Sequence, residues 1–263
     1  MPEIANRKAT LLRHDFDGIV SLRLNRPDYN LLSIELLENL CRELENIALD
    51  KKIRVVVIES SGKAFCAGHD LAEMRKNSSK EYIKNLFEMC SRMMIKITKI
   101  PQPVIAKVHG AAVAAGCQLV AQCDLAVASD KAEFGTSGIN IGLFCSTPMV
   151  AVTRNLSRKH AMELLLTGEL ISASDAVRIG LINHAVTSSN LDEAVKDLAL
   201  RIAKKSPFAI GLGKNLFYKQ IEEGIEAAYK RASDAITCNM MDEETKLGID
   251  AFLAKKPLPQ WKA

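Results

Sequence analysis

Two segments rich in small residues are the places in this sequence where chemistry could occur. Residues 61–70 (SGKAFCAGHD) and residues 109–117 (HGAAVAAGC) each follow an apolar run that predicts a strand. Small side chains let a ligand approach the backbone closely, and in a parallel sheet ligands bind beyond the carboxyl ends of the strands. A helix that begins there presents free N–H groups to a developing anion. Each segment could therefore donate one N–H group to an oxyanion, although such turns also serve packing alone.

Side chains near these segments offer few routes to catalysis. His69 could act as a general base near neutral pH, or could be a loop histidine with no catalytic role. Asp70 is expected to cap a helix that begins at Leu71. Cys145 would be a nucleophile only with a stabilised thiolate, and the sequence pairs it with no base. The cysteines show no metal-site spacing, so we expect no metal.

The predicted elements place both segments at one edge of a sheet. Alternating residues predict two short strands between residues 10 and 24, turning at residues 17–18. Hydrophobic periodicity then predicts helices and strands in alternation, over residues 34–49 (helix), 53–58 (strand), 81–98 (helix), 103–108 (strand), 115–122 (helix) and 125–128 (strand). Strand, helix, strand in succession implies parallel crossovers, so we predict an α/β fold with a buried parallel sheet flanked by helices.

The last third of the chain is predicted to be helical. Beyond residue 147 strand signals become sparse, and helical patterns cover residues 148–155, 159–167, 173–179, 191–205 and a longer set after residue 207. The only plausible junction lies between Ser206 and Pro207, so we divide the chain into a core of residues 1–206 and a helical region of residues 207–263. A helical tail of this kind often packs against another subunit.

The composition argues against several classes of protein. Of 263 residues, 48% are hydrophobic and 25% charged, and the net charge of +4 comes from interspersed charges, which does not favour a nucleic-acid partner. No run approaches the roughly 20 apolar residues of a membrane span, and the first ten residues lack an apolar signal core. The odd number of cysteines, seven, favours reduced thiols. We therefore expect a cytoplasmic protein with no membrane partner.

Several motifs, in order along most of the chain, resemble the crotonase, or enoyl-CoA hydratase/isomerase, superfamily. They are AFCAGHDL (residues 64–71), PVIAKVHGAAVAAGCQLVAQCDLAVAS (residues 103–129), FGTSGINIGL (residues 134–143) and TGELISASDAVRIGLIN (residues 167–183). The resemblance implies a spiral of ββα turns with a helical C-terminal region that mediates trimers, often paired into hexamers. It also implies an acyl-CoA ligand, with coenzyme A as part of the substrate and no prosthetic group.

The resemblance also implies a set of site residues. The two oxyanion N–H groups of the family fall on Cys66 and Ala115. Phe252 and Lys255 match a pair that contacts the adenine end of CoA from a neighbouring subunit. The residues expected to border the CoA arm and the acyl pocket are Ala64, Ala67, Gly68, His69, Asp70 and Leu71.

Two positions depart from the family pattern. Hydratases of the family use two glutamates to activate and place water, and here these positions hold Gln118 and Gly138. Glutamine has no useful basicity near neutral pH, and glycine has no side chain. Two hypotheses therefore stay open. The chain is either an enzyme that acts on a fatty acyl-CoA through an oxyanion hole and an unconventional base, or a non-catalytic acyl-CoA-binding or regulatory module.

Overall fold

The computed structural model describes residues 9–26 and 28–261. The expectation of no apolar signal core rests mainly on residues 1–8, which lie outside the described residues. None of the described helices is long and apolar enough to cross a membrane.

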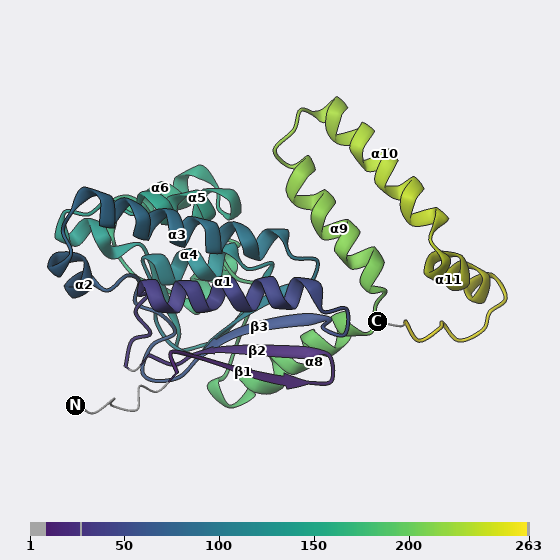
Figure 1. The fold of residues 1–263 in the computed structure, drawn as a ribbon, viewed down its shortest axis with the longest axis horizontal. Coiled ribbons are helices and arrows are strands. Elements are labelled where there is room, and N and C mark those ends of the chain that lie inside the picture. Colours follow the sequence, from purple (N-terminus) through teal and green to yellow (C-terminus); the bar gives the residue numbers. More distant parts are fainter. Residues whose placement is uncertain (1–8, 27, 262–263) are drawn as a thin grey trace, which may run out of the picture.

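A six-stranded sheet forms the centre of the fold (Figure 1). Its strand order is β1-β2-β3-β4-β6-β9, and every neighbouring pair is parallel except β1 with β2. The strands are β1 (Leu11–Phe16), β2 (Ile19–Leu24), β3 (Val55–Ser60), β4 (Val104–Val108), β6 (Leu125–Ser129) and β9 (His184–Val186). The predicted α/β class, the parallel sheet and the first hairpin are confirmed.

Helices cover both faces of this sheet because its strands are apolar on both sides. Val56 and Ile58 of β3 belong to a buried cluster with residues of α1 (Ile34–Leu49), α3 (Lys80–Lys99) and α4 (Ala115–Gln122). The alternate residues Val55 and Val57 pack with α8 (Leu191–Ala203) on the other face. A strand buried on both faces reads as a continuous apolar run, which is how β3 appears in the sequence.

A second, small sheet joins the loops beyond the strand ends. It pairs β7 (Glu133–Gly135) with β5 (Ala112–Val113) and β8 (Ile171–Ser172). Strands β5, β7, β8 and β9 each have two or three residues, too few for a period to show. The remaining helices of the core are α2 (Leu71–Lys76), α5 (Ser146–Asn155), α6 (Arg158–Thr167) and α7 (Ala173–Arg178).

The chain ends in three helices that project away from the core, here called the C-terminal arm (Figure 1). They are α9 (Pro207–Gln220), α10 (Ile225–Met241) and α11 (Glu243–Leu253), and none of their residues is buried. Ser206 caps α9 by accepting a hydrogen bond from the N–H of Ala209. The predicted division between residues 206 and 207 stays a prediction, since the helix start alone does not define a domain.

Candidate functional site

A largely apolar cavity of about 570 Å³ lies where the two segments rich in small residues meet. Its walls come from α2 and the segment before it, from α3, from the start of α4, and from the stretch between β7 and the first turn of α5. The lining residues are Ala67, His69, Leu71, Met74, Phe87, Ala114, Ala115, Ser137, Gly138, Ile141, Leu143, Phe144, Cys145, Ser146, Thr147 and Pro148. No Asp, Glu, Lys or Arg is among these lining residues.

Helix α4 begins at the cavity wall with a free backbone donor. Ala114 precedes it with φ of +51° and ψ of −117°, a conformation that costs an alanine on the order of 1–3 kcal/mol. The N–H of Ala115, in the first turn, donates to no acceptor within the described part of the chain. Gly116 lets the helix approach the first segment, because a Cβ there would lie 2.0 Å from the carbonyl oxygen of Cys66.

The first segment presents its donor at His69. The N–H of Leu32 donates to the carbonyl oxygen of Gly68 at 2.8 Å, and in a trans peptide the following N–H points the opposite way. The N–H of His69 therefore points away from Leu32, and no acceptor for it lies among the described residues. A Cβ on Gly68 would lie 3.3 Å from the Ala115 nitrogen, so the two N–H groups belong to adjacent backbone.

The predicted donor at Cys66 is therefore corrected. Its N–H donates to the carbonyl oxygen of Ala111 at 3.2 Å, in a bridge between the two segments, and its side chain is fully buried behind the cavity wall. Burial raises the pKa of the Cys66 thiol to about 12. The sequence identified the correct loop but not the residue, because the direction of each peptide depends on the pairing with Leu32 and Ala112.

The imidazole of His69 does not face the cavity as a base. Its Nδ1 lies 3.2 Å from the carbonyl oxygen of Leu32, and its Nε2 is buried without a partner among the described residues. The ring packs edge-on against Phe87 with centroids 5.1 Å apart. Burial lowers the pKa of His69, so the ring is neutral at neutral pH. With no accessible lone pair, a general-base role is not supported.

The other residues expected around the acyl-CoA divide into two groups. Ala67 and Leu71 line the cavity, whereas Ala64 is buried away from it. Asp70 caps α2 through the N–H of Glu73 at 3.0 Å and pairs with Arg26 at 2.8 Å, as the sequence predicted for a cap. The hydrogen bond from the Glu73 N–H holds the pKa of Asp70 below its usual value. Asp70 is thus a structural carboxylate.

The two positions of the family glutamates differ in their surroundings. Gln118 is buried, and its Oε1 has no hydrogen-bond partner within the described ranges. Gly138 lines the cavity, but a Cβ there would lie 2.4 Å from the carbonyl oxygen of Leu143 and 3.0 Å from Sγ of Cys145. The loop has therefore closed over position 138, and it leaves no space for a longer side chain unless its backbone moves.

The predicted adenine contacts lie outside this cavity in a single chain. Phe252 belongs to α11 and is 74% exposed, and Lys255 follows that helix. In Figure 1, α11 and α2 lie at opposite ends of the molecule. A contact with CoA by Phe252 or Lys255 would need a second subunit, and it stays a prediction.

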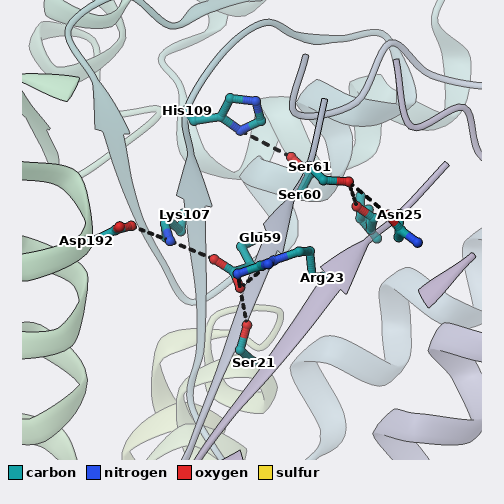
Figure 2. A network of polar contacts seen from close by, with 10 residues as sticks. Ser21, Arg23, Asn25, Glu59, Ser60, Ser61, Lys107, His109 and Asp192 are labelled. Atoms are coloured by element: carbon teal, nitrogen blue, oxygen red, sulfur yellow. Dashed lines mark hydrogen bonds and ion pairs between the residues drawn. The ribbon is translucent and has the colours of Figure 1, made fainter. Parts of the chain in front are cut away.

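A second polar cluster occupies the α8 face of the sheet (Figure 2). Glu59 accepts hydrogen bonds from Ser21 and from Arg23, at 3.0 Å, and it pairs with Lys107 at 2.6 Å. Lys107 also pairs with Asp192 of α8. The cluster ties strands β2, β3 and β4 to α8, and each charge has an opposite partner, so we interpret it as structural. No three His, Cys, Asp or Glu side chains in residues 9–26 and 28–261 are grouped to hold a metal ion.

Comparison with known proteins agrees with this arrangement. Residues 15–263 match the family described as enoyl-CoA hydratase/isomerase. The chain belongs to this family. A crystal structure of an enoyl-CoA hydratase from Mycobacterium smegmatis is 49% identical, with a TM-score of 0.95 over 96% of this chain and 99% of that chain. The crotonase fold and its helical C-terminal region are thereby confirmed.

The curated relatives include a protein that bears on cellular location. The rat enoyl-CoA hydratase domain-containing protein 3, mitochondrial, is 43% identical over 93% of this chain and 82% of its own length. The crystal structure of the human protein of that name is 41% identical, with a TM-score of 0.92 over 95% of this chain and 99% of that chain. The sequence stretches GCQLVAQCDLAVASDKAEF (residues 116–134) and GLFCSTP (residues 142–148) already suggested this subgroup, which is confirmed.

The expectation of a cytoplasmic protein is wrong by the same comparison. The relatives of this subgroup from rat, frog, mouse and human are all named mitochondrial. The cysteine count indicates a reducing environment, which is a property shared by more than one compartment. The cysteine count therefore does not by itself indicate the cytoplasm.

Proposed function

We propose that this protein binds a fatty acyl-CoA and holds the thioester carbonyl oxygen between the backbone N–H groups of His69 and Ala115. The observation that supports it is the pair of unengaged, adjacent donors at the wall of an apolar cavity. An oxyanion is stabilised by fixed donors that need no reorganisation, and one such donor is worth about 3–4 kcal/mol in acyl-transfer sites. Coenzyme A is part of the ligand, and the proposal includes no prosthetic group.

The geometry favours carbonyl polarisation over hydration. Two N–H groups stabilise enolate-like charge on the thioester, but adding water across a double bond also requires proton transfer at two carbons. No carboxylate lines the cavity, because position 138 is a glycine with no room for a longer side chain and Gln118, an uncharged amide, is buried and is not among the lining residues. These two residues support the second candidate function as well, a non-catalytic acyl-CoA-binding module.

Binding to matched ligands tests the role of the two donors. We expect hexanoyl-CoA to bind more tightly than its thioether analogue, which lacks the carbonyl oxygen, by about tenfold or more. Isothermal titration calorimetry measures both affinities. Equal affinities for the two ligands would refute the oxyanion hole.

Turnover of crotonyl-CoA separates the two candidates. We expect hydration by the native protein to be slower than by a two-carboxylate hydratase by at least about 10²-fold, the typical contribution of one acid–base group. Gln118→Glu should raise the rate, whereas Gly138→Glu should not, because the carbonyl of Leu143 obstructs the new side chain. Absence of turnover with a panel of CoA thioesters, together with tight binding, would favour the non-catalytic module.

We also propose that the C-terminal arm packs against a second copy, in a trimer or a hexamer. The arm exposes apolar side chains that no described part of its own chain covers, among them Phe217, Ile225, Tyr229 and Phe252. Exposed apolar surface of this extent is typical of an interface. Sedimentation velocity tests the assembly, and a monomer at micromolar concentration would contradict it.

A further inference from the structure

We propose that the imidazole of His69 is a positioning residue, which holds the peptide bond that carries the first oxyanion donor. This inference rests on the proposed function, because it concerns the same carbonyl-binding site. It assigns the side chain of His69 a role distinct from that of its backbone N–H group.

Two hydrogen bonds join Gly68 and His69 to Leu32, one made by the peptide between them and one made by the His69 ring. The N–H of Leu32 donates to the carbonyl oxygen of Gly68 at 2.8 Å, and the His69 ring lies with Nδ1 3.2 Å from the carbonyl oxygen of Leu32. The loop therefore forms hydrogen bonds with both the backbone N–H and the backbone carbonyl oxygen of Leu32, one through its backbone and one through a side chain. A rotation of the peptide that turned the His69 N–H away from the cavity would break the first bond and strain the second.

The tautomer follows from the acceptor. A carbonyl oxygen can only accept, so Nδ1 of His69 carries the hydrogen and Nε2 does not. Nε2 is buried without a partner among the described residues, and the ring lies edge-on to Phe87. A buried nitrogen left unpaired in this way does not contribute to stability. The ring therefore contributes one useful polar group, the Nδ1–H that holds Leu32.

Gly68 makes this restraint necessary. Its φ of +91° lies where glycine is preferred, and glycine leaves the adjoining peptide free to rotate. The carbonyl-binding geometry depends on the direction of that peptide, while the second donor is fixed at the start of α4. The loop donor thus needs a side-chain restraint that the helix donor does not.

Two substitutions separate the hydrogen bond from the shape of the ring. His69→Asn keeps an N–H donor near the position of Nδ1, and His69→Phe keeps an aromatic ring against Phe87 but has no donor. Both leave the backbone N–H in place. Isotope-edited infrared spectroscopy of hexanoyl-CoA labelled with ¹³C at the carbonyl reports polarisation directly, since a carbonyl that accepts strong hydrogen bonds absorbs at lower frequency.

We expect the native protein and His69→Asn to lower the carbonyl frequency of the bound ligand, and His69→Phe to lose most of that shift. The affinity of His69→Phe for hexanoyl-CoA should fall about three- to tenfold, the effect of one neutral hydrogen bond, while its affinity for the thioether analogue stays unchanged. Binding of the analogue also shows that the variant is folded. If phenylalanine prevents folding, His69→Met replaces it as the variant without a donor.

The outcomes distinguish this inference from the proposed function. No shift in the native protein would overturn the oxyanion hole, and the positioning role with it. A shift in the native protein that His69→Phe retains in full would overturn the positioning role alone. Loss of the shift in both variants would also overturn it, because the donor that His69→Asn keeps would then not be sufficient to hold the peptide.

Discussion

The core and the C-terminal arm are both helical on their surfaces, but they bury their side chains differently. Helices α1 and α3 of the core each contain five buried apolar residues, whereas α9, α10 and α11 contain no buried apolar residue. The cavity and both of its N–H donors lie entirely in the part that forms its own hydrophobic core. Close packing therefore sets the geometry of the cavity and its donors. The position of the arm depends instead on a few polar contacts with the core.

A buried polar cluster joins the arm to the core. Lys214 of α9 is 6% exposed in its side chain and pairs with Asp124 at 2.6 Å. It also donates to the carbonyl oxygens of Ile97 and Gln102, both at 2.8 Å. Tyr218 donates to the same Asp124 at 2.8 Å. An anchor of this kind is sensitive to the loss of one partner, since the remaining charge stays buried.

The largest effect is expected at this anchor. Lys214→Met leaves the carboxylate of Asp124 without its cation and should lower the free energy of unfolding by about 3–5 kcal/mol. Urea denaturation followed by circular dichroism measures it. Lys246→Met is the matched control, because its exposed pair with Glu243 should contribute less than about 1 kcal/mol. Similar values for both variants would show that the arm is held in some other way.

A glycine substitution compares packing in the two regions directly. Gly116→Ala in α4 would place a Cβ 2.0 Å from the Cys66 carbonyl oxygen, and the cost of moving that backbone should reach about 3 kcal/mol. Gly213→Ala in α9 meets nothing within 4 Å and should stabilise by up to about 1 kcal/mol, as expected for an exposed helix interior. Thermal denaturation of both variants tests the contrast. If both substitutions stabilised the protein, or both destabilised it, the contrast in packing would be contradicted.

Within the core, the sequence predicted the helices better than it predicted the site. The helices with five buried residues have a clear hydrophobic period, so their bounds were predicted to within one or two residues. The donor of the first segment was misplaced by three residues, from His69 to Cys66, because a local pattern does not contain the pairing of Leu32 with Gly68. The block at Gly138 depends on the carbonyl of Leu143, a contact that the local sequence pattern does not contain either.

The polar cluster on the α8 face should make the stability of the core depend on acid. Burial of Glu59 opposes its ionisation, but hydrogen bonds from Lys107 and Ser21 outweigh it and lower its pKa. A lowered folded pKa gives stability that is present above the unfolded value of about 4.5 and is lost as the pH falls through the folded value. Glu59→Gln should therefore cost about 1–3 kcal/mol at neutral pH and much less in acid.

Urea denaturation of the native protein and Glu59→Gln over a series of pH values measures this difference. The two curves should converge below the pKa of the native carboxyl group, where Glu59 is protonated and also neutral. The Arg231–Glu223 ion pair serves as the comparison, since Arg231 is exposed and Glu223→Gln should leave stability almost unchanged. A gap between the Glu59 curves that stayed constant in acid would contradict the argument.

The smallest effect is expected at Ala114, where the site itself holds strain. Its φ of +51° and ψ of −117° suit glycine better than alanine, and the N–H of this residue donates to the carbonyl oxygen of Gly135 at 2.9 Å. Ala114→Gly relieves the strain but gives the unfolded chain more freedom, so the net gain should be no more than about 1 kcal/mol. The added freedom would act next to the Ala115 donor, so hexanoyl-CoA should bind no more tightly although the protein is more stable.

Lys255, which follows α11, serves as the control because it also has a positive φ, of +53°. It lies far from the two oxyanion donors, so Lys255→Gly should change stability and leave ligand affinity unchanged. Thermal denaturation and calorimetric titration of both variants measure the two quantities separately. If Ala114→Gly destabilised the protein, the backbone at the start of α4 would not be strained, and the contrast between the core and the arm would rest on packing alone.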